Sequence, residues 1–172
     1  MKTEDESILT KYTSREEIAA ALKKNRDQAG ADLSNLDLSG FKLTAMNLEA
    51  ANLSGADLSK ATIAGINMEA VDLSDAILRD ATVAGANFEN VNLRGADLTG
   101  SRWMGVNVEG ADFTNANMNG ARAAGVSWTS AKVPPDVIPE PLKPPAWVPA
   151  LVIGFGALLV MIVLFLKRQR EQ

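Results

Sequence analysis

The chain contains no cysteine and no histidine among its 172 residues. It therefore has no disulfide, no Ser-His-Asp triad, no Cys-His nucleophilic site and no Cys/His zinc site. Carboxylates are plentiful, but the eight Asp and four Glu between residues 31 and 130 mostly occupy positions of a repeat. Every Gly of that region follows the same period, so there is no phosphate-binding glycine loop. We expect no catalytic, cofactor-binding or metal-binding residues, and a protein that is not an enzyme.

Proline is absent before residue 134, and all seven prolines lie between Pro134 and Pro149. A segment so rich in proline cannot form a helix or a central strand. We therefore expect residues 132–146 to form a stiff, extended linker. The apolar side chains at its start, Val133, Val137 and Ile138, are expected to cover the end of the preceding domain near Trp128.

A five-residue repeat runs without a break from Ala31 to Ser130. Its unit is a small residue, Asp or Asn, a central apolar residue, a polar residue, and Gly or another polar residue; residues 51–55 read Ala-Asn-Leu-Ser-Gly. A period of five fits neither an α-helix nor a β-strand. A bend in every unit would keep all central residues on one side of the chain. Because one unit cannot bury its apolar residue alone, the repeat predicts a solenoid.

The twenty units from Ala31 to Ser130 resemble the pentapeptide-repeat family, whose shorthand is A(D/N)LXX. The resemblance implies an all-β fold, a right-handed quadrilateral β-helix with four pentapeptides per coil and about five coils. It also implies that the central residue and the small residue two positions before it point inward. Some members of the family mimic the DNA duplex and occupy type II topoisomerases such as DNA gyrase. The repeats carry twelve acidic and six basic residues, a balance that permits this function.

Aromatic residues make up only 5% of the chain, which fits a narrow coil with little interior room. Trp103 is the exception at a central position. Its counterparts twenty residues away, Val83 and Ala123, are smaller. We interpret this as volume compensation between stacked coils.

A period of twenty residues is superimposed on the period of five. The position before the central residue, normally Asp or Asn, departs from this rule at Lys42, Thr62, Thr82, Arg102 and Arg122, and elsewhere only at Ile77 and Ser127. The outward position after the central residue in the same five units holds Thr44, Ala64, Ala84, Met104 and Ala124. We expect these residues to stack into a flat side that is easily desolvated. The candidate interaction surface comprises Thr62, Ala64, Thr82, Ala84, Arg102, Met104, Arg122 and Ala124; alternatively, its alanines are merely tolerated at the surface.

Four glutamates, Glu49, Glu69, Glu89 and Glu109, form a second series spaced by twenty residues. We treat this acidic stripe as a candidate docking site for a basic partner. A solvated stripe that maintains solubility is the alternative reading. The net negative charge of the repeats argues against an ordinary DNA- or RNA-binding surface.

The two ends of a solenoid expose apolar side chains and strand edges, so they need caps. Ser14 and Glu17 have the spacing of a helix capping box. Ile18, Ala21 and Leu22 would share one helix face and cover the first coil, where Leu36, Phe41 and Met46 replace the small residues of most later coils.

Residues 147–166 form a run of twenty residues without a charge, which matches the thickness of a bilayer. Trp147 suits one membrane interface, and the basic tail suits the other. The count of basic residues favours a cytoplasmic C-terminus, but no apolar signal segment begins the chain. We expect a single-pass, tail-anchored protein with a cytoplasmic solenoid. Ala150 and Gly154 could also mediate self-association through this helix.

The sequence predicts six parts: a mobile N-terminus (1–13), a capping helix (14–28), a β-helix (31–131), a Pro-rich linker (132–146), a transmembrane helix (147–166) and a basic tail (167–172). We expect a membrane-anchored, non-enzymatic interaction scaffold that binds a protein partner, such as another membrane protein, and uses no cofactor. An acidic DNA mimic that binds or protects a type II topoisomerase such as DNA gyrase is the alternative.

Overall fold

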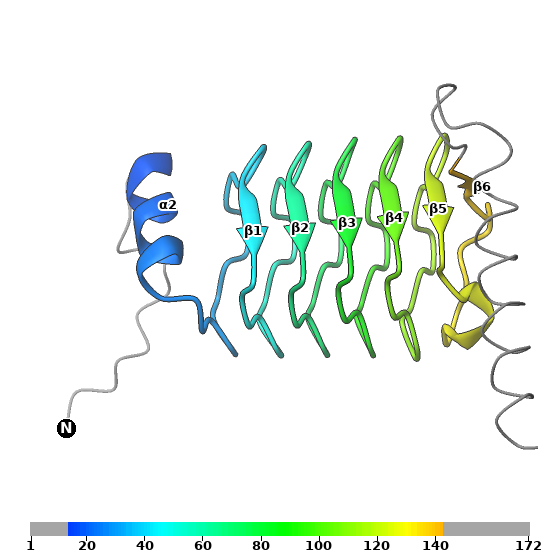
Figure 1. The fold of residues 1–172 in the computed structure, drawn as a ribbon, viewed down its shortest axis with the longest axis horizontal. Helices are drawn as coiled ribbons and strands as arrows, with labels where there is room; N and C mark the ends of the chain where they lie inside the picture. The colour runs from blue at the N-terminus through cyan, green and yellow to red at the C-terminus, as the bar shows by residue number, and fades with distance from the viewer. Residues whose placement is uncertain (1–13, 143–172) are drawn as a thin grey trace, which may run out of the picture. The chain divides into compact units, whose positions relative to one another are not determined.

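A parallel β-solenoid follows one N-terminal helix in the computed structural model of this chain, which describes residues 14–142 (Figure 1). The elements are α2 (Arg15–Lys24), β1 (Lys42–Thr44), β2 (Thr62–Ala64), β3 (Thr82–Ala84), β4 (Arg102–Met104), β5 (Arg122–Ala124), the 3₁₀ helix η1 (Trp128–Ser130) and β6 (Glu140–Pro141). The predictions for residues 1–13, 143–146, 147–166 and 167–172 concern parts outside the described residues. Between residues 14 and 142, no helix has the length and apolar character that a membrane crossing requires.

Successive coils pair in parallel with an offset of twenty residues. In the sheet β1–β5, Ile63 lies opposite Leu43 on one side and Val83 on the other. Three further series of isolated parallel bridges repeat the same offset, represented by Asn52–Asp72, Asp57–Ile77 and Asn67–Asn87. Each coil therefore has four short sides and pairs with its neighbour on all of them. The solenoid predicted from the repeat is confirmed, and its four sides agree with the quadrilateral shape that the family resemblance implied.

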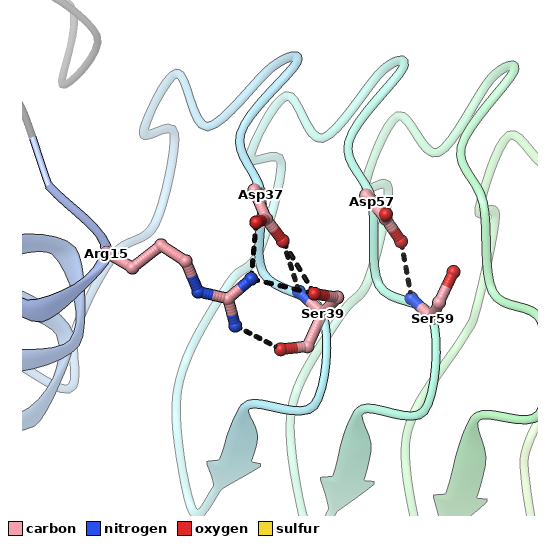
Figure 2. A network of polar contacts seen from close by, with 5 residues as sticks. All are labelled: Arg15, Asp37, Ser39, Asp57 and Ser59. Carbon is pink, nitrogen blue, oxygen red and sulfur yellow. Dashed lines mark hydrogen bonds and ion pairs between the residues drawn. The ribbon is translucent and has the colours of Figure 1, made fainter.

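The Asp or Asn of a unit fixes a corner of the coil (Figure 2). The Asp57 carboxylate accepts a hydrogen bond from the Ser59 N–H at 2.8 Å. One coil earlier, Asp37 accepts the equivalent bond from the Ser39 N–H at 3.0 Å. Such bonds satisfy turn amides that would otherwise need water, which explains why these residue types recur beside a bend.

The core contains the two inward positions of each unit. Every central residue from Leu33 to Ala123 is buried, and so are the inward alanines Ala56 and Ala76. Burying one Val, Leu, Ile, Phe or Met side chain contributes about 1.5–3 kcal/mol to folding, and most units supply one such side chain at their centre. The predicted inward positions are confirmed.

Trp103 is the largest completely buried side chain among the described residues. Its neighbours in register are Val83 and Ala123, as volume compensation requires. The indole N–H donates to Ser101 Oγ at 2.9 Å, and that hydroxyl donates to the Leu98 carbonyl at 2.6 Å. Ser101 therefore occupies a position normally held by Ala because Trp103 needs a buried acceptor.

Helix α2 covers the open face of the first coil. Ser14 Oγ accepts a hydrogen bond from the Glu17 N–H at 3.2 Å, which confirms Ser14 as the N-cap residue of the predicted helix. Ile18 and Leu22 are each only 6% exposed and belong to the same core as the repeats. The helix ends at Lys24, earlier than the predicted range of 14–28, because Asp27 already forms a bridge with Asn47 in the first coil.

Arg15 joins the helix to the first coil (Figure 2). Its guanidinium group forms an ion pair with Asp37 and donates to the hydroxyl group of Ser39 at 2.8 Å and to the Ser39 carbonyl. The same group lies 5.1 Å from the centre of the Phe41 ring. These contacts fix the helix to one corner of the coil as well as to its apolar interior.

The segment after the last coil, which was predicted to be a stiff, extended linker, pairs with the solenoid over its first part. It remains paired with the solenoid as far as Leu142, whose N–H donates to the Ala123 carbonyl at 3.0 Å. Proline is tolerated here because β6 is an edge strand that pairs on one side only. The predicted cover by Val137 and Ile138 is wrong: they are 49% and 55% exposed. The buried residues of this segment are Pro135 and Pro139 instead.

Candidate protein-interaction surface

The predicted flat side of the solenoid coincides with its regular sheet, β1 to β5. We define the flat wall as the outward residues of these strands: Lys42, Thr62, Thr82, Arg102 and Arg122 in one column and Thr44, Ala64, Ala84, Met104 and Ala124 in the other. The central residue of each strand, such as Val83, points inward and is buried. Because each strand presents two outward side chains, the flat wall has two parallel columns of side chains.

The five strands of this sheet lie where the position before the central residue is not Asp or Asn. That departure alone does not produce a strand. The five strands occur in units that lack the corner carboxylate or amide. Ile77 also lacks it, yet this residue forms isolated bridges with Asp57 and Asp97 and is followed by a turn. Whether one side of a coil forms a three-residue strand or a single bridge followed by a turn therefore depends on the whole coil.

Small, uncharged side chains form the middle of the flat wall. Thr62, Ala64, Thr82 and Ala84 are half-buried, whereas Met104 is 41% exposed. The structure thus brings together all eight residues of the predicted interaction surface, in the register that the twenty-residue period predicted.

Charge is confined to the two ends of the flat wall. Lys42 lies at one end, and Arg102 and Arg122 stack next to each other at the other. Strand β6 adds Glu140 directly beside Arg122. The sequence period could not reveal this carboxylate, because Glu140 belongs to the Pro-rich segment beyond the repeats.

The acidic stripe also stacks as predicted, over a ladder of amides. In each unit the Glu N–H donates to the side-chain oxygen of the Asn two residues earlier, as from Glu69 to Asn67 at 3.2 Å. The Asn amides themselves join adjacent coils, with Asn107 Nδ2 donating to Asn87 Oδ1 at 2.9 Å. This ladder was not predicted from the sequence, although Asn recurs there at every twentieth residue. None of the four glutamates takes part in the ion pairs found between residues 14 and 142.

Two further arginines neutralise aspartates on other sides of the solenoid. Arg94 lies 3.3 Å from the Asp112 carboxylate, and Arg79 lies 2.5 Å from that of Asp97. The side chain and backbone of Thr114 donate hydrogen bonds that lower the pKa of Asp112, and Arg94 lowers it further. Burial raises the pKa of Asp97, but hydrogen bonds from Thr99 and Arg79 outweigh it, so that the pKa falls. Part of the acidic charge of the repeats is thus balanced locally.

These observations define a repeat solenoid whose outward positions form one flat, weakly polar side and one acidic stripe. A family model for pentapeptide repeats matches residues 29–69, 66–102 and 92–127, which together cover more than half of the chain. The chain belongs to the pentapeptide-repeat family.

Two solved structures share this fold. The chain is 26% identical to HetL, a pentapeptide repeat protein involved in heterocyst differentiation regulation in the cyanobacterium Nostoc, with a TM-score of 0.53 over 65% of this chain. It spans about half of HetL, 51% of that chain. It is 23% identical to a pentapeptide repeat protein from the Arabidopsis thaliana thylakoid lumen, with a TM-score of 0.55, covering 59% of this chain and 70% of that one. A comparison with curated protein sequences finds no match.

Proposed function

We propose that this protein is a membrane-anchored, non-enzymatic scaffold that binds a protein partner through the flat wall. One observation carries the proposal: the half-buried, uncharged centre formed by Thr62, Ala64, Thr82 and Ala84. Such a surface loses little solvation when a partner covers it, whereas every charged side chain buried without a partner is costly. The charged residues at its two ends then set the orientation of the partner.

Matched substitutions on two sides of the same coil test this proposal. Ala84→Arg places a long charged side chain in the centre of the flat wall, while the inward Val83 keeps its place. Ala84 is half-buried but lies at an outward position of β3, so the Arg side chain can extend into solvent. Surface substitutions of this kind usually change stability by less than about 0.5 kcal/mol, so folding should persist. Capture of partners from detergent-solubilised membranes, quantified by mass spectrometry, should fall sharply. Glu89→Lys is the control; if it alone abolishes capture, the acidic stripe is the binding surface and the proposal is wrong.

The membrane anchor in this proposal is the uncharged segment 147–166, with the solenoid on the cytoplasmic side. The support is its length, which matches a hydrocarbon core of about 30 Å. Protease added to intact cells should leave residues 14–142 undigested, and permeabilised cells are the control. Digestion of the solenoid in intact cells would reverse the orientation. Recovery of the full chain in the soluble fraction would remove the anchor.

Mimicry of DNA is the second candidate, favoured by the excess of twelve acidic over six basic residues in the repeats. A DNA mimic would use the acidic stripe rather than the flat wall. Inhibition of gyrase supercoiling by the purified chain, abolished by Glu89→Lys and unaffected by Ala84→Arg, would favour this function. No inhibition at micromolar protein concentration would exclude it.

A further inference from the structure

A groove separates helix α2 from the edge strand β1. It has a volume of about 340 Å³. Its apolar lining includes Leu22, Phe41 and Met46, and its basic lining consists of Lys23, Arg26 and Lys42. Strand β1 ends the sheet on the side of α2 (Figure 1). The groove, which Lys42 and Thr44 of β1 line, therefore runs along a sheet edge. Its strand residues, Lys42 and Thr44, also belong to the flat wall.

The three basic side chains of the groove have no carboxylate partner in the part of the chain between residues 14 and 142. The ion pairs found there involve Arg15, Arg79 and Arg94 instead. Arg26 donates to the Thr44 carbonyl, which holds its guanidinium group at the groove, and Lys23 and Lys42 are exposed. No acidic residue is found in the lining. The groove thus has an apolar floor and an uncompensated basic rim, which fits a segment that is both acidic and apolar.

The chain itself carries such a segment shortly before helix α2 in the sequence. Residues 4–9 read Glu-Asp-Glu-Ser-Ile-Leu, three acidic residues followed by two large apolar ones. We propose that this segment occupies the groove, with its acidic residues against Lys23, Arg26 and Lys42 and with Ile8 and Leu9 against the apolar floor.

The connection between this segment and the groove is short enough for docking within one chain. Four residues lie between Leu9 and Ser14, so the two Cα atoms are five steps apart and span at most about 17 Å when extended. Ala19, which lines the groove, lies about 7.5 Å along the helix from Ser14 at 1.5 Å per residue. A tether of this length gives an effective concentration on the order of millimolar. The segment of the same chain therefore outcompetes the segment of a second copy at micromolar protein concentration.

Engineered cysteines can test the docking because the natural chain has none. The full-length chain in detergent micelles would carry Ile8→Cys with Thr44→Cys, in the groove, or Ile8→Cys with Glu49→Cys, on the first coil outside it. Intramolecular disulfide formation under mild oxidation, followed by peptide mass spectrometry, gives the two rates. We expect the groove pair to react about tenfold faster than the control pair, as a docked segment requires.

A charge reversal separates docking from random collisions of a tethered chain. Glu4→Lys, Asp5→Lys and Glu6→Lys together leave the length of the segment and its apolar residues unchanged. They should bring the two rates within about twofold of each other, and 1 M salt should act in the same direction. Three results would each overturn the proposal. The two cysteine pairs could react at equal rates without the charge reversal, the reversal could leave the rate of the groove pair unchanged, or the disulfide could join two chains.

Discussion

Gly95→Ala should destabilise the solenoid through a contact with the coil below it. Gly95 has φ +70°, and a Cβ added there would lie 2.3 Å from Asp75 Oδ1, one coil earlier. An Ala at positive φ costs about 1–2 kcal/mol. Moving the Asp75 side chain out of its preferred rotamer costs about 0.5–1.5 kcal/mol more. The lower entropy of the unfolded chain offsets about 0.4–1 kcal/mol of this cost, so the net loss of stability should be about 0.5–3 kcal/mol.

Gly85→Ala is the matched control for this substitution. Gly85 has φ +54°, but no atom lies within 4 Å of the position that a Cβ would take. Only the cost of the positive φ remains for Gly85→Ala. Its loss of stability should therefore be about 0.5–1.5 kcal/mol smaller than that of Gly95→Ala, which also displaces the Asp75 side chain. Urea unfolding of the full chain in detergent, followed by tryptophan fluorescence, measures both losses.

A double substitution isolates the contact itself. Asp75→Ala removes the carboxylate that the new Cβ would meet. Stacked alanines fit at such corners, because Ala50 and Ala70 lie twenty residues apart with φ 55° and 56°. In a double-mutant cycle, Asp75→Ala should therefore reduce the cost of Gly95→Ala by about 0.5–1.5 kcal/mol. Additive losses, or equal losses for Gly95→Ala and Gly85→Ala, would refute the argument.

Two further predictions concern the interior and the surface charges. Trp103→Ala should lower the stability measured by urea unfolding by about 3–5 kcal/mol. Trp103→Phe should lower it clearly less, because Ser101 keeps its bond to the Leu98 carbonyl. Equal losses for the two variants would contradict this prediction. Hydrogen bonds with Thr114 and Arg94 lower the pKa of Asp112 below its ordinary 3.8. Its contribution to stability is therefore complete above about pH 4 and is lost as the pH falls through the lowered pKa. The decrease in stability on acidification should be smaller in Asp112→Asn than in the unsubstituted protein. Identical pH profiles of the two proteins would contradict this prediction.

The sequence predicted the solenoid well because its period is a direct consequence of stacking. Residues such as Thr62 and Thr82 repeat at twenty positions because they lie opposite each other in adjacent coils. The same reasoning placed all members of the flat wall and the acidic stripe. No knowledge of long-range contacts beyond the period itself was required.

The ends of the solenoid could not be predicted in this way, because no period extends into them. The segment after the last coil was expected to form a stiff, extended linker, since proline excludes a helix or a central strand. An edge strand needs hydrogen bonds on one side only, and that allows Pro141 to pair with Ala123. Likewise, the groove beside β1 depends on where α2 ends and on the position of Arg26. Local sequence patterns do not contain that information.

In this chain, departures from the repeat are more informative about function than the repeat itself. The central residue, the small inward residue and the corner Asp or Asn are fixed by packing and turn geometry, so they would recur in a solenoid of any function. The outward positions of β1–β5 are free of these demands, yet their central members are uncharged in a chain that is 22% charged. Solubility alone would favour charge there. The absence of charge on Ala64 and Ala84 is therefore the departure on which the proposed contact with a partner rests.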